Sequence, residues 1–441
     1  MVQPPFVLEP ESEARGFRKY VPHPGHPRIA GLDQTDIETY SMKIASYPEV
    51  VRVFDQWKAQ LNEPFYGITT DGQRKEGLFG IDDEGAPVEQ MVAAAKEVEA
   101  VLSEEELRVV SHEIDSHDWR KWSNPEVLIF QYGVRLHTLT PPKIVAILKL
   151  VEASLSEAGY RKVVTAMDLN HFLGELVNGA PILNRHSYQF AMYGIQSTTE
   201  PWGFSLTGHH MCLNIFIVGK QMTISPVFIG AEPNEIDAGP LKGLTVCTDE
   251  GSYALQLMQT LPDQLKRKAQ IYTEMYSEKM PPDRWNPYDQ RHLGGAFQDN
   301  RIIPYEGIKA IDMPSAQQDI LLKVIGSFLD LLPPSPFEAR MRQVKKSLNE
   351  TYFSWIGGYG DKDPFYYRIQ SPVIMLEFDH HSGVFLLNKV PAKHHVHTII
   401  RTPNGNDYGR ELLKGFRGGN GGVRATRTWP TKCSGTAFRI N

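Results

Sequence analysis

The sequence predicts an α+β protein in which a helical N-terminal half packs on a mainly antiparallel sheet. Apolar residues recur at helical spacing through most of residues 35–178. β-prone runs gather in two clusters, 187–229 and 351–401, where only short polar or glycine-containing breaks separate them. Such short breaks favour antiparallel neighbours over βαβ units. Because helical patterns lie between the clusters, we expect one sheet assembled from distant parts of the chain.

We expect a single large domain over residues 35–417, flanked by two segments of different composition. Residues 1–34 are rich in proline, glycine and charge, which is typical of an arm that follows a surface. Residues 418–441 are rich in Gly, Thr and Arg and have no apolar periodicity, so we expect a flexible tail.

The helical patterns have recognisable starts and stops. A bend is expected at Pro48, and Ser103 is a candidate N-cap with Glu106 at the capping-box spacing. The predicted helices cover residues 36–61, 90–102, 104–114, 140–159, 162–177, 255–275, 316–332, 338–349 and 408–415.

The predicted strands are short and rich in β-branched and aromatic residues. They cover residues 188–195, 202–207, 209–218 and 221–229 in the first cluster, and 351–356, 365–369, 373–379, 384–387 and 394–401 in the second. Residues 277–305 read as a long ordered loop, which is uncommon in a compact domain unless it covers something.

Composition excludes several classes of function. The chain has 441 residues, 41% of them hydrophobic and 22% charged, as in globular proteins. A net charge of −6 argues against general binding to nucleic acid. No apolar run reaches the roughly 18 residues that span a bilayer, and the N-terminus does not resemble a secretory signal. Three widely spaced cysteines indicate a reducing compartment, so we expect a cytoplasmic protein.

Residues 373–401 combine acids and histidines between two predicted strands. Residues two apart on a strand face the same way, so Glu377 and Asp379 share one face, and His395 and His397 share one face of the other strand. If the strands are neighbours, these carboxylates and imidazoles lie close together. They are then the ligand set of a divalent metal such as Zn, Mn or Fe. The alternative is that the histidines belong to a solvated loop.

A second histidine pair, His209 and His210, follows Gly208 at the start of a predicted strand. Adjacent strand residues point to opposite faces, so one of the pair is expected to face the core. His210 shares the more polar face with Cys212 and is the preferred ligand, whereas His209 is the weaker candidate.

Arginine and aromatic side chains are the candidates for binding the substrate. Arg401 has the same parity as the two histidines of its strand, so it can clamp a carboxylate or phosphate, or instead pair with Glu377 or Asp379. Arg368 can act in the same way, while Tyr367 and Trp202 offer stacking surfaces.

Several motifs together resemble a family of bacterial and fungal proteins known only as a domain of unknown function. The resemblance covers roughly residues 35–415. It is carried by the Gly-His-His strand, the Glu-x-Asp strand and the His-x-His-Thr…Arg…Asp-Tyr-Gly segment. In that family the last motif runs into a leucine-rich helix, whereas this chain departs after Leu413 into the Gly-rich tail. The resemblance implies no activity.

The residues predict a metal-dependent hydrolase of a small polar or anionic molecule. The metal lowers the pKa of a bound water, a free carboxylate is the general base, and Arg401 or Arg368 orients the substrate. Two alternatives stay open: a non-haem Fe(II) oxygenase with a His/carboxylate site, and a non-catalytic module that binds a small molecule or sugar. The oligomeric state does not follow from the sequence.

Overall fold

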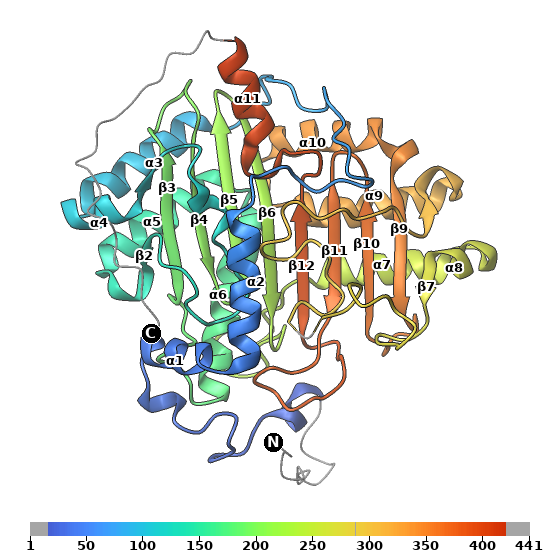
Figure 1. Ribbon diagram of the computed structural model, residues 1–441, viewed down its shortest axis with the longest axis horizontal. Coiled ribbons are helices and arrows are strands. Elements are labelled where there is room, and N and C mark those ends of the chain that lie inside the picture. Colours follow the sequence, from blue (N-terminus) through green and yellow to red (C-terminus); the bar gives the residue numbers. More distant parts are fainter. Residues whose placement is uncertain (1–15, 287, 420–441) are drawn as a thin grey trace.

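The computed structural model describes residues 16–286 and 288–419 and confirms the α+β fold (Figure 1). One twelve-stranded sheet runs through this part of the chain. Its strands are β1 (Ser111–His112), β2 (Val134–Arg135), β3 (Tyr188–Gly194), β4 (Trp202–Gly208), β5 (Met211–Val218), β6 (Gln221–Ala231), β7 (Gln270–Tyr272), β8 (Ile308–Lys309), β9 (Tyr352–Gly357), β10 (Phe365–Gln370), β11 (Met375–His380) and β12 (Val396–Arg401).

The two strand clusters join into one sheet, as the sequence predicts. The strand order is β1-β3-β4-β5-β6-β12-β11-β10-β9-β7, with β2 beside β3 and β8 beside β9. The clusters meet where β6 pairs antiparallel with β12, which places Thr398 opposite Ile229. The pairings β1–β3 and β7–β9 are parallel and lie at the two ends of the sheet. The last strand of the chain is therefore central.

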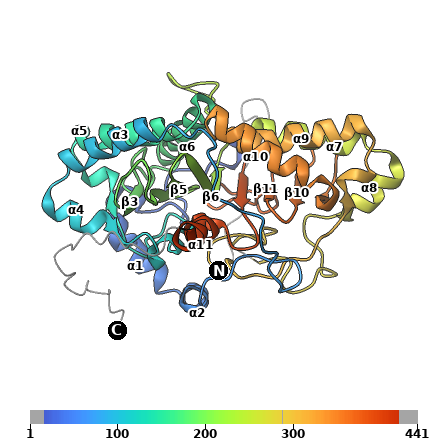
Figure 2. The ribbon, with the colours of Figure 1, turned by 90° about the horizontal axis from the view of Figure 1, so that it is seen from above.

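Helices from both halves of the chain cover one face of the sheet (Figure 2). This layer contains α3, α5 and α6 from the first half and α7, α9 and α10 from the second, while α1, α2 and α11 lie on the other side. The helices are α1 (Ile37–Ala45), α2 (Pro48–Asn62), α3 (Val88–Val101), α4 (Glu104–Val110), α5 (Pro141–Ser154), α6 (Glu157–Leu176), α7 (Thr248–Thr260), α8 (Asp263–Ala269), α9 (Ser315–Leu329), α10 (Pro334–Lys346) and α11 (Arg410–Gly419).

Helix boundaries differ from the predictions where a local signal was misread. The predicted bend at Pro48 is a full break, because Pro48 begins α2. The predicted capping box at Ser103 is confirmed. Gly159 does not end α5; it lies in the first turn of α6, where Ser156 caps its N–H at 2.9 Å. A Cβ at Gly159 would lie 2.6 Å from the Leu331 Cα, so this glycine serves close packing.

One predicted strand is shorter than expected, and another is absent. The strand expected over 209–218 starts at Met211, because His209 and His210 form the tight turn between β4 and β5. No strand forms over 384–387. There the N–H groups of Val384 and Leu386 donate to the carboxylate of Glu232, at 2.8 and 3.0 Å, instead of to a neighbouring strand. The helix expected over 255–275 is also interrupted, between α7 and α8.

The two faces of the sheet have separate cores. Leu376 and Phe378 of β11 pack in the large cluster under the helices, whereas Ile399 of β12 and Phe228 of β6 pack in a smaller, aromatic-rich cluster on the opposite face. Glu377 and Asp379 alternate with Leu376 and Phe378, so they point away from the helical layer. Helix α2 and several loops cover this face.

The predicted arm is described from residue 16, where the short 3-10 helix Gly16–Tyr20 buries Phe17 against the main core. The predicted tail, beyond Gly419, lies outside the described residues. Within the described ranges, no helix combines the length and apolar character needed to cross a membrane.

A buried arginine ties the sheet to the loop over 277–305. Arg401 at the end of β12 donates to Asp299 at 2.8 Å and to Asp407 at 3.0 Å. It also donates to the carbonyls of Gly294 and Gly295, at 2.8 and 2.7 Å. The side chain is fully buried. A fully buried charge destabilises the fold unless all of its ionic and hydrogen-bond partners are present.

We predict that Arg401→Gln lowers the free energy of unfolding by about 3–5 kcal/mol, because it leaves the carboxylate of Asp407 buried without its cation and leaves Asp299 paired with Arg120 alone. Urea denaturation measures the change. The matched control is Arg161→Gln, which breaks an exposed ion pair to Glu157 on α6 and should cost less than about 1 kcal/mol. Equal effects of the two substitutions would contradict the prediction.

Candidate metal centre

Six histidines gather on the loop-covered face of the sheet, and each is at most 4% exposed. They come from four segments that are far apart in the sequence. The turn between β4 and β5 supplies His209 and His210, the loop over 277–305 supplies His292, the residue after β11 is His381, and the start of β12 supplies His395 and His397.

The first group of possible metal ligands comprises His210, His395 and His397, whose ligand nitrogens lie within 4.8 Å of one another. The Nε2 atom of His395 lies 3.0 Å from Nε2 of His397 and 3.4 Å from Nε2 of His210. The other ring nitrogen of His395, Nδ1, donates to the carbonyl of Ser382 at 2.8 Å. In the neutral ring this leaves a lone pair on Nε2, which is the arrangement found in metal-binding histidines.

The backbone forces His210 into the cluster. His210 has a φ of 58°, a left-handed conformation that is rare for a residue with a side chain. Its N–H donates to the carbonyl of Asn124, and its carbonyl accepts from the N–H of Gly230 at 2.8 Å. A Cβ at Gly230 would lie 2.8 Å from Cδ2 of His397, so glycine there leaves room for the ring. Strain of this kind is common at functional sites.

His209, the weaker predicted ligand, lies beside the cluster but outside both groups of ligand nitrogens. Its Nδ1 donates to the side-chain oxygen of Asn170 at 2.8 Å, and its ring stacks on that of His210 with 3.9 Å between centroids. It belongs to neither group of clustered ligand nitrogens. The structure therefore places His209 beside the cluster, as a support for His210.

The two predicted acids lie next to the histidines, and they hold a loop in place. Asp379 is directly opposite His397 in the β11–β12 pair, as the strand argument requires. Its Oδ1 accepts from Nε of Arg291 at 2.6 Å. Glu377 accepts from the N–H groups of Leu293 and Gly294, both at 2.8 Å. The carboxylates thus fix residues 291–294, and with them His292.

Histidines 292 and 381 were not predicted as ligands, yet with His397 they form a second group whose ligand nitrogens lie within 4.8 Å of one another. His381 Nε2 lies 3.0 Å from Oδ2 of Asp379, although the angle is too poor for a hydrogen bond. One feature of the sequence pointed to His292: it lies in the long loop over 277–305, which was expected to cover another part of the protein. Nothing in the sequence showed which strand it crosses.

The predicted substrate-binding residues are not brought together. Arg401 binds its own acids, as described above, and not Glu377 or Asp379. Arg368 donates to Glu306 and to the carbonyl of Pro304. Tyr367 and Trp202 lie in the large core on the helical face, and Tyr367 donates to the carbonyl of Glu250 in α7. The sheet separates both aromatic rings from the histidine cluster.

Burial controls the protonation of the cluster. Removal from water lowers the pKa of His395 to about 4 and that of His209 to about 3, and it lowers the pKa of His397 well below the ordinary value. These rings are neutral at pH 7 and can bind a metal. Burial would raise the pKa of Glu377, but the neighbouring His292 and Tyr366 outweigh it and hold the pKa at about 2. Glu377 is therefore a carboxylate.

Glu232 at the end of β6 is a further acid that sequence reasoning missed. Burial raises its pKa to about 7. Its Oε1 lies 3.8 Å from Nδ1 of His395, and it accepts the N–H groups of the turn over 384–386. It therefore links the first histidine group to that turn.

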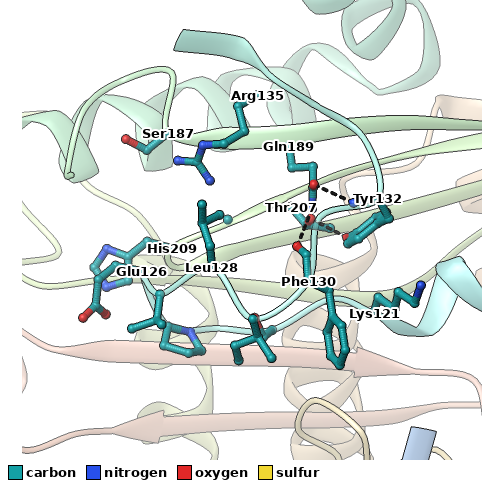
Figure 3. A pocket seen from close by; sticks show the side chains of 15 residues that line it. Lys121, Glu126, Leu128, Phe130, Tyr132, Arg135, Ser187, Gln189, Thr207 and His209 are labelled. Atoms are coloured by element: carbon teal, nitrogen blue, oxygen red, sulfur yellow. Dashed lines mark hydrogen bonds between the residues drawn. The ribbon is translucent and has the colours of Figure 1, made fainter. Parts of the chain in front are cut away.

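A cavity of about 30 Å³ lies beside His209 (Figure 3). In this view the guanidinium of Arg135 points toward Leu128, with Glu126 and His209 at one end and Lys121 at the other. Nε of Arg135 is buried and has no hydrogen-bond partner among the described residues. The cavity thus contains a guanidinium with one unpartnered donor, and His209 lies between this cavity and the first histidine group.

We predict that the chelated, metal-free protein loses stability as the pH falls from 6.5 toward 5. The unfolded chain takes up protons on His209 and His395 in this range, whereas the folded chain, with pKa values of about 3 and 4, does not. Each such proton contributes a slope of up to about 1.4 kcal/mol per pH unit. Urea denaturation at several pH values measures the slope.

His209→Gln should make this dependence shallower, because one titrating ring is removed. The exposed helix residue His171 is the control, and His171→Gln should leave the slope nearer to that of the wild type. A His209→Gln slope equal to that of the wild type would show that His209 is protonated in the folded protein.

Comparison with known proteins gives a family but no activity. No curated protein and no solved structure matches the chain. A family model described as "Protein of unknown function (DUF3500)" matches residues 84–410, which include every strand of the sheet from β1 to β12 and all six histidines. The chain belongs to this family.

Proposed function

We propose that the protein is a metal-dependent hydrolase whose metal ion is held by His210, His395 and His397. The observation that carries the proposal is the contact of three buried Nε2 atoms, with His395 oriented by its Nδ1–H bond to Ser382. Three neutral imidazoles that meet through one nitrogen each cannot all be satisfied by hydrogen bonds to one another. A single metal cation accepts a lone pair from each of the three nitrogens.

An all-imidazole ligand set supports hydrolysis over oxygenation. Three histidines and an open position are a common set for catalytic zinc, and the ion supplies a bound water of lowered pKa. The oxygenase alternative needs two histidines and one carboxylate. Both oxygens of Glu377 already accept backbone N–H groups, and Oδ1 of Asp379 accepts from Arg291. Imidazole ligands favour Zn or Fe over Mn.

Among the predicted general bases, Asp379 is favoured over Glu377. Oδ2 of Asp379 accepts one long hydrogen bond, 3.4 Å from the backbone nitrogen of Arg291. This oxygen can therefore still accept a proton. The cavity beside His209 is lined by Arg135, whose Nε–H is unpartnered among the described residues and supports binding of a small anionic molecule, whereas Lys121 is paired with Asp118. We keep the cytoplasm as the proposed location, since Cys212 and Cys247 are both buried free thiols.

We predict that His397→Ala abolishes metal binding, because it removes a ligand that both histidine groups share. Protein purified without a histidine tag and incubated with zinc should hold at least one ion per chain, and the variant should hold close to none. Elemental analysis after gel filtration measures both.

His171→Ala is the matched control, since it removes an exposed histidine of α6 and should leave the metal content unchanged. The proposal fails if the wild-type protein holds no metal after loading, or if hydrolysis survives a chelator. Oxygen uptake by iron-loaded protein would instead indicate the oxygenase.

We predict that Arg135→Gln raises KM for anionic substrates on the order of tenfold, the worth of one charged hydrogen bond. The measurement uses small esters, lactones and amides in pairs with and without a carboxylate group. Neutral members should be little affected, and Arg161→Gln on the exposed face of α6 should change neither. An equal loss for neutral and anionic members would contradict a role in charge recognition.

A further inference from the structure

The second histidine group contains a side chain that the protein leaves without a partner. His292 is 1% exposed, and neither of its ring nitrogens has a hydrogen-bond partner among the described residues. The nearest acid oxygen, Oε2 of Glu377, is 3.7 Å from Nδ1, beyond hydrogen-bond range. Buried polar atoms are nearly always satisfied, so a ring with two orphaned nitrogens indicates a ligand that completes it.

Two carboxylates hold the second group in position. Glu377 accepts the N–H groups of Leu293 and Gly294 and so fixes the residues directly after His292. Asp379 lies 3.0 Å from Nε2 of His381. Carboxylates are commonly found next to metal-binding histidines, although neither ring is hydrogen-bonded to its acid here. Glu377 and Asp379, which were predicted as metal ligands, thus contact the histidines of the second group or the residues next to them.

His397 belongs to both groups and has two nitrogens to offer. Its Nε2 lies 3.0 Å from Nε2 of His395, on the side of the first group. Its Nδ1 is buried and has no hydrogen-bond partner among the described residues. The ring of His292 is parallel to that of His397 within 14°, and the His381 ring lies 3.8 Å from it. The His397 ring therefore has His292 and His381 as close neighbours, in addition to the rings of the first group.

We propose that His292, His381 and Nδ1 of His397 form a second metal site, so that the His397 ring bridges two divalent ions. This inference rests on the proposed function, because the first ion occupies the other nitrogen of the bridge. Binding of the second ion displaces the Nδ1 proton of His397 to solvent, so one proton leaves for each second ion bound. Metal–nitrogen bonds of about 2 Å on each side of the ring put the ions on the order of 6 Å apart.

The chemistry of the ligands selects the ion. Imidazole suits zinc and copper, whereas calcium, magnesium and manganese prefer oxygen ligands. Residue burial adds to this selection, because a strongly hydrated ion would have to lose its water. We therefore expect zinc and copper to fill both sites, and magnesium to fill neither.

The test titrates metal-free, full-length protein with zinc and counts the bound ions by elemental analysis. We expect two ions in the wild type, one in His292→Gln, one in His395→Gln and none in His397→Gln. His171→Gln is the control and should keep two. Circular dichroism and the thermal midpoint of each metal-free variant show that it folds, and only folded variants are compared.

The outcomes separate the two proposals. One ion in the wild type, retained in His292→Gln and lost in His395→Gln, overturns the second site and leaves the proposed function standing. No ion in the wild type overturns both. Two ions that both survive His292→Gln also overturn the second site.

Copper tests the bridge itself. Two copper(II) ions joined through one imidazolate couple their spins, so the electron paramagnetic resonance signal of the doubly loaded wild type should fall well below two spins per chain. His292→Gln with one copper should give a full single-spin signal. Two independent spins in the wild type would overturn the bridge.

Discussion

The candidate centre depends on how two carboxylates of β11 hold the loop over 277–305. Glu377 and Asp379 are buried on the face of the sheet opposite the main helical layer. Their oxygens accept from Leu293, Gly294 and Arg291, at 2.8, 2.8 and 2.6 Å. Charge-assisted bonds of this kind are strong when water is excluded. They place the loop across the strands, and the loop in turn seals the histidines from solvent.

The order of the strands explains why the histidines meet. The turn between β4 and β5 lies near the end of β6 that pairs with β12, and the backbone of His210 is bonded to Gly230 there. His397 in β12 and His395 directly before it lie in the middle of the sheet, between strands from the two clusters. The helical layer packs on the other face and contacts the centre through Asn170 of α6, which bonds to His209.

Sequence reasoning predicted the parts of the site that follow from strand parity. The cross-strand position of Asp379 and His397 and the fold class needed only alternation and spacing. His292 could not be predicted as a ligand, because its position depends on which strand a 29-residue loop crosses. The positions of Arg401 and Tyr367 could not be predicted either. A buried arginine or a core tyrosine differs from a substrate-binding residue only in the groups that it contacts, which the sequence does not give. His210 was predicted on a strand and lies in a turn, yet it reaches the cluster because of its left-handed backbone.

The most direct measurement is anomalous diffraction at the zinc edge from crystals of the protein loaded with zinc. The central claim is that buried imidazoles, rather than the carboxylates beside them, hold a metal. It predicts a strong anomalous peak about 2.0–2.1 Å from Nε2 of His210, His395 and His397. A peak bound to Glu377 or Asp379 instead, or peaks only at the protein surface, would contradict it.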